Sequence, residues 1–442
     1  MPALCRESPT VSVLAPPKSP PLSELTGRQW QWIAGGAMMT LATMPGQTNF
    51  IAQFNTALRT EFGLSHGQFG GFYTLATLAS ASVLVFAGIL ADKFPARRLA
   101  IICMLGLAAT ALIMAGAGHV AILVLALAML RFFGQGMLSH VAMTTMSRWF
   151  NRFRGRALSF AGLGFTLGDA VLPFVLTVSI LTFGWRNVWA GAAAVLVGLV
   201  VPAIWFLLRD PPEGRKGRPV IPNPDGGGML EPTGLQWTRS RVLRDPLFYF
   251  LLPGIMAPPA IGTLYIFHQA HLTEVKGWDL TVFTAMFPFL SLSVAVSSIF
   301  AGFLVDRFGA WRLMPFVLLP LAVASLILGT FAPIWSMPIA FVCIGLTQGM
   351  TNPVVGALWA EIYGTAHIGA VRSLVTAALV AASALGPGIA GYLIDTGAPI
   401  TVQTFGYAAY CVLGSILYLG LQAALSRRVA TISWRSTGVA GH

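Results

Sequence analysis

The sequence has too few charged residues for a protein that folds in water. Only 10% of its 442 residues are Asp, Glu, Lys or Arg, and 56% are hydrophobic. A soluble domain carries about 25% charged residues, so this chain lacks the polar side chains to cover a water-facing surface. The composition therefore indicates an integral membrane protein.

Cysteines and catalytic motifs are also scarce. Three of the four cysteines (Cys103, Cys343 and Cys411) lie in apolar stretches, and no Cys-x-x-Cys occurs, so we expect neither a disulfide framework nor a metal site. There is no Gly-x-x-x-x-Gly-Lys-Ser/Thr loop and no His/Glu metal motif. The glycines of 162–168 are misspaced for a dinucleotide fingerprint. We therefore expect no cofactor, no use of ATP and no enzymatic activity.

Long hydrophobic runs, in contrast, fill most of the chain. About 20 apolar residues cross the hydrocarbon core of a membrane as a helix. Twelve such runs are predicted, at 30–57, 66–91, 97–118, 120–147, 155–182, 186–208, 246–272, 279–305, 311–331, 334–360, 367–394 and 401–425. The expected fold is an all-α membrane protein with twelve transmembrane helices.

A change of composition divides these helices into two groups of six. Residues 209–245 are rich in Pro, Gly and charge, which is typical of a linker. The predicted domains are a disordered tail at 1–28, a six-helix bundle at 29–208, the linker at 209–245, a second bundle at 246–426 and a C-terminal tail at 427–442.

Basic residues predict how the helices are oriented in the membrane. The net charge of +12 is spread between the apolar runs, which argues against nucleic acid as a partner. If both termini lie on one side, that side receives 23 of the 27 Lys and Arg residues, and the other side receives Arg59, Arg186 and Lys276. The positive-inside rule then places both termini in the cytoplasm.

One charged turn occurs twice, 214 residues apart. Gly88-Ile-Leu-Ala-Asp92-Lys-Phe-Pro-Ala-Arg-Arg returns as Gly302-Phe-Leu-Val-Asp306-Arg-Phe-Gly-Ala-Trp-Arg. Each copy joins two apolar runs. The repeat indicates that the two bundles arose by duplication and are related by pseudo-symmetry.

This turn resembles the loop signature of the major facilitator superfamily of secondary transporters, G-x-L-[AG]-D-[RK]-x-x-x-R-R. Arg131 followed by Gly134 and Gly136, and the Gly-Pro-rich stretch 384–391, resemble two further elements of that family. The resemblance covers 29–426 and implies two pseudo-symmetric six-helix bundles that expose a central site to each side of the membrane in turn.

The sequence does not match the pattern of any one subfamily throughout. The fifth run lacks the Gly-Pro pair of drug/proton antiporters. The stretch 45–50 and the pair His268-Gln269 resemble bacterial relatives of oxalate and monocarboxylate transporters. The basic residues that those anion carriers hold inside their eighth and eleventh helices are absent here.

Arg131 is the one basic residue in the middle of a predicted span. It lies 16 residues before the end of its run near Ser147, or ~24 Å along a helix, and Asp169 lies 14 residues into the next run, or ~21 Å. Because an unpartnered charge at this depth costs at least ~2.5–3.5 kcal/mol, we expect the two to meet. One interpretation is a structural clamp. The other is that Arg131 faces the cavity and binds a substrate carboxylate when Asp169 is protonated.

The family resemblance implies that the first, fourth, seventh and tenth helices line the cavity. Amides and phenols at that depth need hydrogen-bond partners, which neighbouring helices or a solute can supply. The predicted substrate and proton-coupling residues are Arg131, Asp169, Gln47, Asn49, Gln135, Tyr265, His268, Gln269, Gln348 and Asn352. Gln53 is a further polar residue on the first helix, and Pro258, Pro259 and Gly262 predict a local break in the seventh.

The repeated turns predict a gate on the cytoplasmic side. Ion pairs across the helix ends would hold the two bundles together there when the opposite side is open, whereas topology alone explains the arginines but not the two aspartates. The predicted gate residues are Gly88, Asp92, Lys93, Arg97, Arg98, Arg148, Arg156, Gly302, Asp306, Arg307, Arg312, Glu361 and Arg372.

These features together predict a monomeric secondary transporter in a lipid bilayer, in the bacterial cell inner membrane. The leading hypothesis is proton-coupled transport of a small, monocarboxylate-like organic anion. Proton-driven efflux of amphipathic compounds is an alternative within transport. A membrane sensor built on a transporter fold, which binds a ligand without flux, is an alternative of another class.

Overall fold

The computed structural model describes residues 25–88, 90–150, 154–209, 237–364 and 367–430. Within these ranges the regular structure is helical and no strand occurs. The first bundle contains α1 (Gly27–Ala42), η2 (Met44–Gly46), α2 (Thr48–Ile51), η3 (Ala52–Phe54), α3 (Asn55–Phe62), α4 (His66–Ala87), α5 (Leu90–Lys93), α6 (Ala96–Ala115), α7 (Val120–Leu130), η4 (Arg131–Leu138), α8 (Ser139–Trp149), α9 (Arg154–Phe183), α10 (Trp185–Val195), η5 (Leu196–Val200) and α11 (Val201–Leu207).

The second bundle follows the predicted linker, most of which lies outside the described residues. It contains α12 (Arg239–Val242), α13 (Pro246–Phe267), α14 (Gln269–Lys276), α15 (Leu280–Thr284), α16 (Phe287–Phe308), α17 (Ala310–Val317), α18 (Leu319–Thr330), α19 (Ser336–Tyr363), α20 (Ile368–Asp395), α21 (Ile400–Gly420) and α22 (Gln422–Ala430).

In the part of the chain that the structure describes, eleven helical stretches are long and apolar enough to cross a membrane. They correspond to the second to twelfth predicted runs. The first run is instead a chain of short helices from α1 to α3, interrupted at Thr43 and Gln47. Pro45 explains the interruption, because it lacks the N–H that a continuous helix would use, and Gly46 adds conformational freedom.

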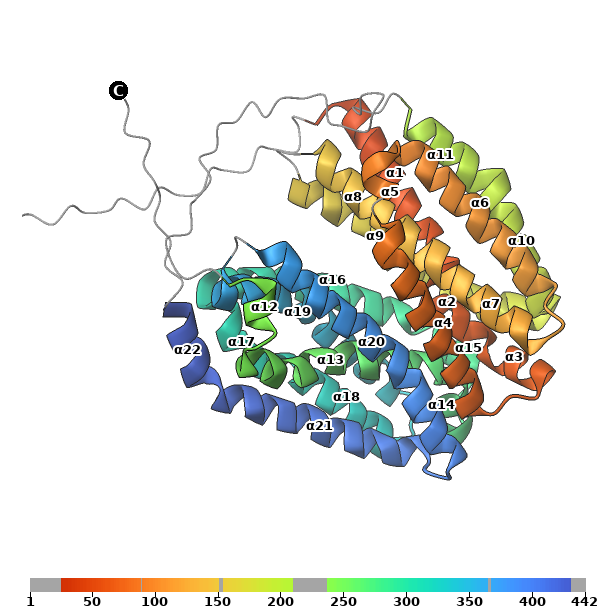
Figure 1. The fold of residues 1–442 in the computed structure, drawn as a ribbon. Coiled ribbons are helices and arrows are strands. Elements are labelled where there is room, and N and C mark those ends of the chain that lie inside the picture. The colour runs from red at the N-terminus through yellow and green to blue at the C-terminus, as the bar shows by residue number, and fades with distance from the viewer. Residues whose placement is uncertain (1–24, 89, 151–153, 210–236, 365–366, 431–442) are drawn as a thin grey trace, which may run out of the picture.

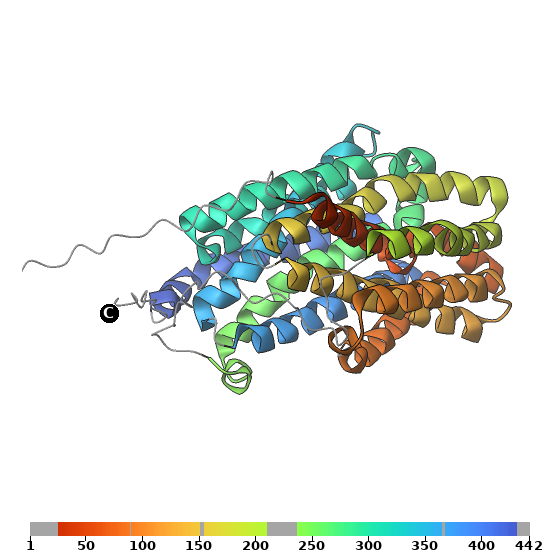
Figure 2. The same ribbon diagram turned by 90° about the horizontal axis from the view of Figure 1, so that it is seen from above.

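Each bundle has its own apolar core. Buried side chains from Leu25 to Leu208, together with Phe267 of α13, form one cluster, and those from Val242 to Leu425 form another. The two bundles lie side by side in Figure 1, and Figure 2 shows their helices running along one common direction, as a membrane domain requires. This arrangement confirms the predicted fold class.

The two ends of the molecule differ in how the bundles meet. We call the end that carries Lys93, Arg98 and Arg312 the basic face, and the end that carries Glu61 and Lys276 the far face. The bundles separate toward the basic face and converge at the far face (Figure 1). The helix pairs α4–α20 and α9–α16 make most of the contact between bundles.

The repeated turn has a different backbone in its two copies. In the first, α4 ends at Ala87 and α6 begins after Pro95. In the second, α16 continues to Phe308 and only Gly309 separates it from α17. Gly309 has φ +82°, a conformation that glycine adopts without strain. Both copies therefore join antiparallel helices at the basic face by different local means.

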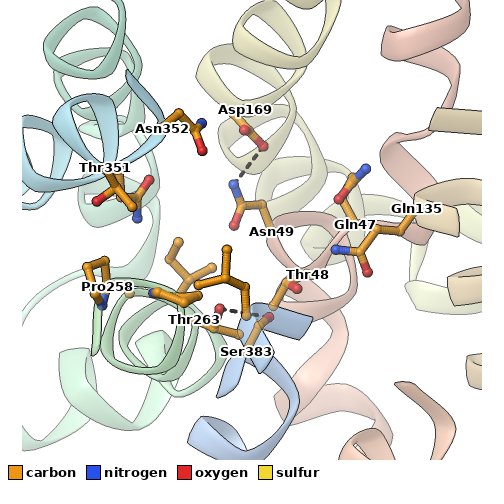
Figure 3. Close-up of a pocket in the computed structure, with 15 residues that line it drawn as sticks. Gln47, Thr48, Asn49, Gln135, Asp169, Pro258, Thr263, Thr351, Asn352 and Ser383 are labelled. Atoms are coloured by element: carbon orange, nitrogen blue, oxygen red, sulfur yellow. Dashed lines mark hydrogen bonds between the residues drawn. The ribbon is translucent and has the colours of Figure 1, made fainter. Parts of the chain in front are cut away.

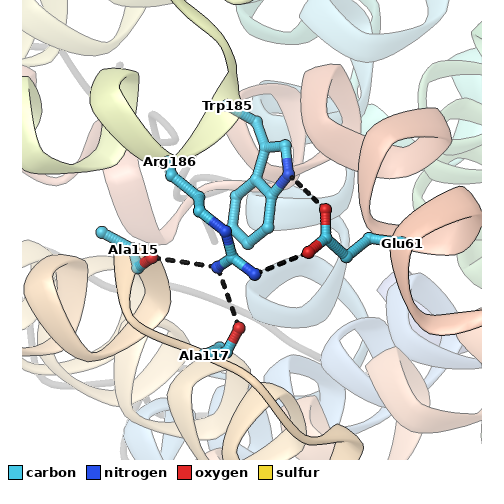
Figure 4. Close-up of polar contacts among 5 residues, drawn as sticks. All are labelled: Glu61, Ala115, Ala117, Trp185 and Arg186. Atoms are coloured by element: carbon cyan, nitrogen blue, oxygen red, sulfur yellow. Dashed lines mark hydrogen bonds and ion pairs between the residues drawn. The ribbon is translucent and has the colours of Figure 1, made fainter.

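A polar cluster ties together the far face of the first bundle (Figure 4). Arg186 donates from Nη1 to the carbonyls of Ala115 (3.0 Å) and Ala117 (2.8 Å), and from Nη2 to the carboxylate of Glu61 (2.7 Å). Hydrogen bonds from Arg186 and then from Trp185 hold the pKa of Glu61 below its ordinary value. The cluster links three connections of this bundle, which favours its movement as one body.

Candidate functional site

A cavity of about 290 Å³ lies between the two bundles (Figure 3). The first bundle lines it from the broken first segment, η4 and α9, and the second bundle from α13, α19 and α20. The lining residues are Gln47, Thr48, Asn49, Gln135, Asp169, Pro258, Pro259, Gly262, Thr263, Ile266, Gln348, Thr351, Asn352, Leu379 and Ser383. Most of the side chains that surround it are neutral and polar.

Two glycines bring the first bundle's polar residues to the cavity. An added Cβ on Gly134 would lie 2.7 Å from the Cα of Gly46, so only glycines allow η2 and η4 to approach this closely. The η4 segment is π-helical, a local form that is frequent at functional sites. Gln47 and Gln135 thereby reach the same cavity wall (Figure 3).

Asp169 is the one charged residue among the described lining residues. Its carboxylate accepts a hydrogen bond of 2.6 Å from the side-chain amide of Asn49, as Figure 3 shows. No ion pair joins Asp169 to Arg131, although both residues lie in the described part of the chain. The predicted pair is therefore wrong for this conformation.

Arg131 lies one layer behind the cavity wall instead of facing the cavity. It is 2% exposed, and its Nη1 donates to the carbonyl of Gly46 and to Thr48 Oγ1, both at 3.2 Å. Its guanidinium also lies 5.1 Å from the ring centre of Tyr73. The break in the first segment explains the difference from the prediction, because it frees the Gly46 carbonyl as an acceptor. Thr48 lines the cavity and so connects Arg131 to it.

Six of the ten predicted substrate residues line the cavity: Gln47, Asn49, Gln135, Asp169, Gln348 and Asn352. Tyr265, His268 and Gln269 do not. Tyr265 donates to Ser325 Oγ at 2.8 Å within the second bundle, Nε2 of His268 lies 2.9 Å from the carbonyl of Pro387, and Gln269 is buried.

The course of α13 explains these differences. The predicted break at Pro258–Gly262 does not occur, since the helix continues to Phe267 and ends at His268. Pro258, Pro259, Gly262, Thr263 and Ile266 form one stripe along this helix and line the cavity. A residue at position 265 falls outside that stripe.

Four lining hydroxyls were not predicted: Thr48, Thr263, Thr351 and Ser383. Thr351 shares a helix face with Gln348, three residues before it, and this spacing would have identified it. Ser383 lies on α20, outside the four helices considered, and its hydroxyl is 3.2 Å from that of Thr263.

The described contacts of the predicted gate residues stay within one bundle. In the first, Arg148 donates to the Ala91 carbonyl at 2.7 Å, and the Arg97 guanidinium lies 3.6 Å from the ring centre of Trp205. In the second, Glu361 accepts from the backbone N–H of Ala310 at 2.8 Å.

The remaining gate residues lie at the same face. Arg372 donates to the Gly356 carbonyl at 2.9 Å, and Arg307 and Arg312 stack near Phe308 and Trp311. Further predicted members at this face are Gly88, Lys93, Arg98, Arg156 and Gly302. The side chains of Asp92 and Asp306 lie outside the described part of the structure. The gate stays a prediction for a conformation in which the bundles meet here.

At the far face, one carboxylate joins the two bundles. Asp395, at the end of α20, accepts from Ser65 Oγ at 2.5 Å and from the backbone N–H groups of His66 (3.1 Å) and Gly67 (2.8 Å). It thus caps the N-terminus of α4 in the other bundle, where unpaired N–H groups and the helix dipole favour an anion. Neither Asp395 nor Ser65 lies in a motif that predicts this contact.

Two further hydrogen bonds and a ring contact close the same end. Asn55 donates to the Phe267 carbonyl at 2.7 Å, and Thr74 donates to the Ala384 carbonyl at 2.6 Å. The ring of Phe267 lies 4.7 Å from that of Tyr73. These contacts therefore join the bundles at the far face, and the ribbons of the two bundles lie farther apart toward the basic face (Figure 1).

Replacing Asp395 with alanine is expected to weaken closure of the far face. The change removes three hydrogen bonds to a charged acceptor, each worth about 1.5–3 kcal/mol where fully buried and less at this exposed position. Distances between spin labels at Thr60 and Thr396 should gain a longer population. Asp279→Ala is the matched control, because Asp279 caps α15 within one bundle. An unchanged distance distribution in the Asp395 variant would show that this carboxylate does not hold the bundles together.

Comparisons with known proteins agree with this architecture. The family model described as Major Facilitator Superfamily matches residues 36–387 and 262–436. The oxalate:formate antiporter of Oxalobacter formigenes is 25% identical over 377 residues, covering 83% of this chain and 85% of that protein. Human monocarboxylate transporter 11 is 25% identical over 319 residues, covering 69% and 64%.

Solved structures share the fold at low identity. A bacterial homologue of the human lysosomal transporter Spinster, in an inward-facing and unoccupied conformation, has a TM-score of 0.66 at 17% identity, covering 92% of this chain and 97% of that one. A mutant of the nucleoside transporter NupG has a TM-score of 0.68 at 12% identity, covering 88% and 99%. The chain is a multi-pass membrane protein and belongs to the major facilitator superfamily of transporters.

Proposed function

We propose that this transporter carries a small organic anion together with a proton by alternating access. The observation that carries the proposal is the separation of two opposite charges around one cavity. Asp169 lines the cavity with an amide as its partner, and Arg131 lies behind Thr48 without a carboxylate partner among the described residues.

Arg131 supplies the attraction for an anion. Charges interact several times more strongly at the effective dielectric constant of a protein, about 20, than in water. Thr48 Oγ1 accepts from Arg131 and lies 2.6 Å from the hydroxyl of Tyr73, and either of those two hydroxyls can be the donor. When Tyr73 donates, the proton of Thr48 is free to donate to a carboxylate in the cavity.

Asp169 supplies the coupling to protons. When it is ionised, its charge offsets that of Arg131 and the cavity gains nothing from a bound anion. When it is protonated, the guanidinium is uncompensated and the anion binds more tightly. By linkage, a bound anion then raises the affinity of Asp169 for its proton, so the two are carried together.

In the proposed cycle, the transporter alternates between a state closed at the far face and a state closed at the basic face. The contacts of Asp395 hold the far face closed in one state, and the predicted gate around Asp92 and Asp306 closes the basic face in the other. The distribution of basic residues supports a cytoplasmic basic face with both termini on that side. We propose the bacterial inner membrane as the location. We propose that the monomer is the working unit, since each chain encloses a complete cavity.

Proteoliposomes with an inward proton gradient test the proposal. Labelled small carboxylic acids should accumulate in them, and a protonophore should abolish the accumulation. Protein-free liposomes control for diffusion of the neutral acid through lipid, and the outer pH is kept where the acids are ionised.

The two alternatives give other results in the same preparation. Binding without flux favours a sensor. Transport of amphipathic compounds without uptake of acids favours efflux, although a wall of amides and hydroxyls suits a polar solute better. Either result would contradict the proposed function.

A further inference from the structure

Three amides of the cavity wall make no hydrogen bond to any described residue. Gln135 lies on η4 of the first bundle, whereas Gln348 and Asn352 lie one turn apart on α19 of the second. The Nε2 atom of Gln348 would lie 2.8 Å from a Cβ added to Gly262, so this amide packs over α13 beside the cavity. Figure 3 shows Asn352 and Gln135 on opposite sides of the cavity.

These free amides constrain the solute once both faces close around it. An amide left without a partner in a closed cavity costs about 1–3 kcal/mol. A solute with a polar group at only one end could hydrogen-bond Thr48 and Gln135 on the first bundle's side of the cavity. The amides of Gln348 and Asn352 on the other side would then have no partner. The cavity volume corresponds to about ten water molecules at roughly 30 Å³ each, which is room for a small organic solute, and closure of the bundles would bring both walls against it.

Charge decides what the second polar group can be. None of the described lining residues is Lys, Arg or His, and the second bundle's wall offers only amides, hydroxyls and apolar groups. A second carboxylate there would have no counter-charge and would share the cavity with Asp169. A hydroxyl or a carbonyl group, in contrast, can both match the amides and remain neutral.

We propose that the solute is a small carboxylic acid with a neutral hydrogen-bonding group at its other end, such as a hydroxy acid or an oxo acid. Its carboxylate lies toward Thr48 and Arg131, and its neutral group bonds Gln348 and Asn352. This inference rests on the proposed function and narrows its substrate class.

Paired isosteres test the inference in proteoliposomes. The pairs are 3-hydroxypropanoate with butanoate, and 4-hydroxybutanoate with pentanoate, in which a hydroxyl replaces a methyl group. We expect the wild-type protein to transport the hydroxy acid with at least a tenfold lower half-saturating concentration. Gln348→Leu and Asn352→Leu should each reduce this preference to below about threefold.

Gln422→Leu is the matched control, because the Gln422 amide bonds the Trp311 carbonyl away from the cavity. It should keep the tenfold preference. Equal transport of both members of each pair by the wild-type protein would overturn the inference and leave the proposed function standing. Transport of neither member would overturn the proposed function itself. The wild-type comparison decides the inference even where a variant does not fold.

Discussion

Replacing Arg131 with methionine is expected to reduce uptake of the organic acid at least 100-fold. The change removes the positive charge next to the cavity and its hydrogen bond to Thr48. A factor of 100 corresponds to about 2.8 kcal/mol, within the range for one charged hydrogen bond together with its long-range attraction. Initial uptake rates in proteoliposomes with equal amounts of incorporated protein measure the effect.

A structural role of Arg131 predicts a different pattern. The side chain also holds the Gly46 carbonyl at the break of the first segment, so its loss can lower thermal stability. Arg131→Lys keeps the positive charge but cannot keep both hydrogen bonds of the guanidinium, to the Gly46 carbonyl and to Thr48 Oγ1. If the charge matters for the anion, lysine should restore uptake at least tenfold over methionine. If packing alone matters, the two variants should be equally inactive and equally destabilised.

Arg186→Met provides the matched control. Arg186 also donates to backbone carbonyls, but it does so at the far face, away from the cavity. This variant should lose thermal stability and keep its affinity for the acid. An Arg131→Met protein that carries the acid at the normal rate would remove Arg131 from the mechanism.

Replacing Asp169 with asparagine is expected to abolish accumulation driven by a proton gradient. Each pH unit drives at most about a tenfold accumulation of a solute that moves with one proton, because one unit is worth about 1.36 kcal/mol. A gradient of two units should give up to about 100-fold accumulation in the wild-type protein and none in the variant. Exchange of labelled for unlabelled acid needs no net proton movement and should stay within about threefold of the wild-type rate.

The pH dependence of exchange gives a second measurement on this variant. Wild-type exchange should fall as the pH rises and Asp169 loses its proton, whereas exchange by Asp169→Asn should not depend on pH in that range. Asp279→Asn, at the far face, should behave as the wild type. Proton-driven accumulation by the Asp169 variant would place the proton site elsewhere.

The fold could be predicted from sequence because the membrane imposes it. Runs of about 20 apolar residues have few alternatives to a spanning helix, and the repeated turn predicted two bundles. The first run was the exception. Pro45 and Gly46 interrupt it, and a window of hydrophobicity does not detect an interruption that leaves the composition apolar.

The site could be predicted only in part, because depth along a helix does not fix the direction of a side chain. Arg131 and Asp169 were matched by depth. The π-helical turn of η4 and the free carbonyl of Gly46 give the guanidinium other partners. Tyr265 was likewise assigned by depth and lies on the other side of α13.

No sequence motif near Ser65 or Asp395 predicts the contact between the bundles at the far face. Ser65 and Asp395 are 330 residues apart, and neither residue stands out in its own segment. The contact becomes evident only when α4 and α20 lie side by side.

Measuring acid uptake and internal pH together is the most direct test of whether the anion and the proton cross the membrane together. A pH-sensitive dye inside proteoliposomes reports the internal pH after the acid is added outside at zero membrane potential. We expect the interior to acidify at the rate of acid uptake, and protein-free liposomes to show neither change. Uptake of the acid by the protein without acidification, or with alkalinisation, would contradict the shared passage of anion and proton.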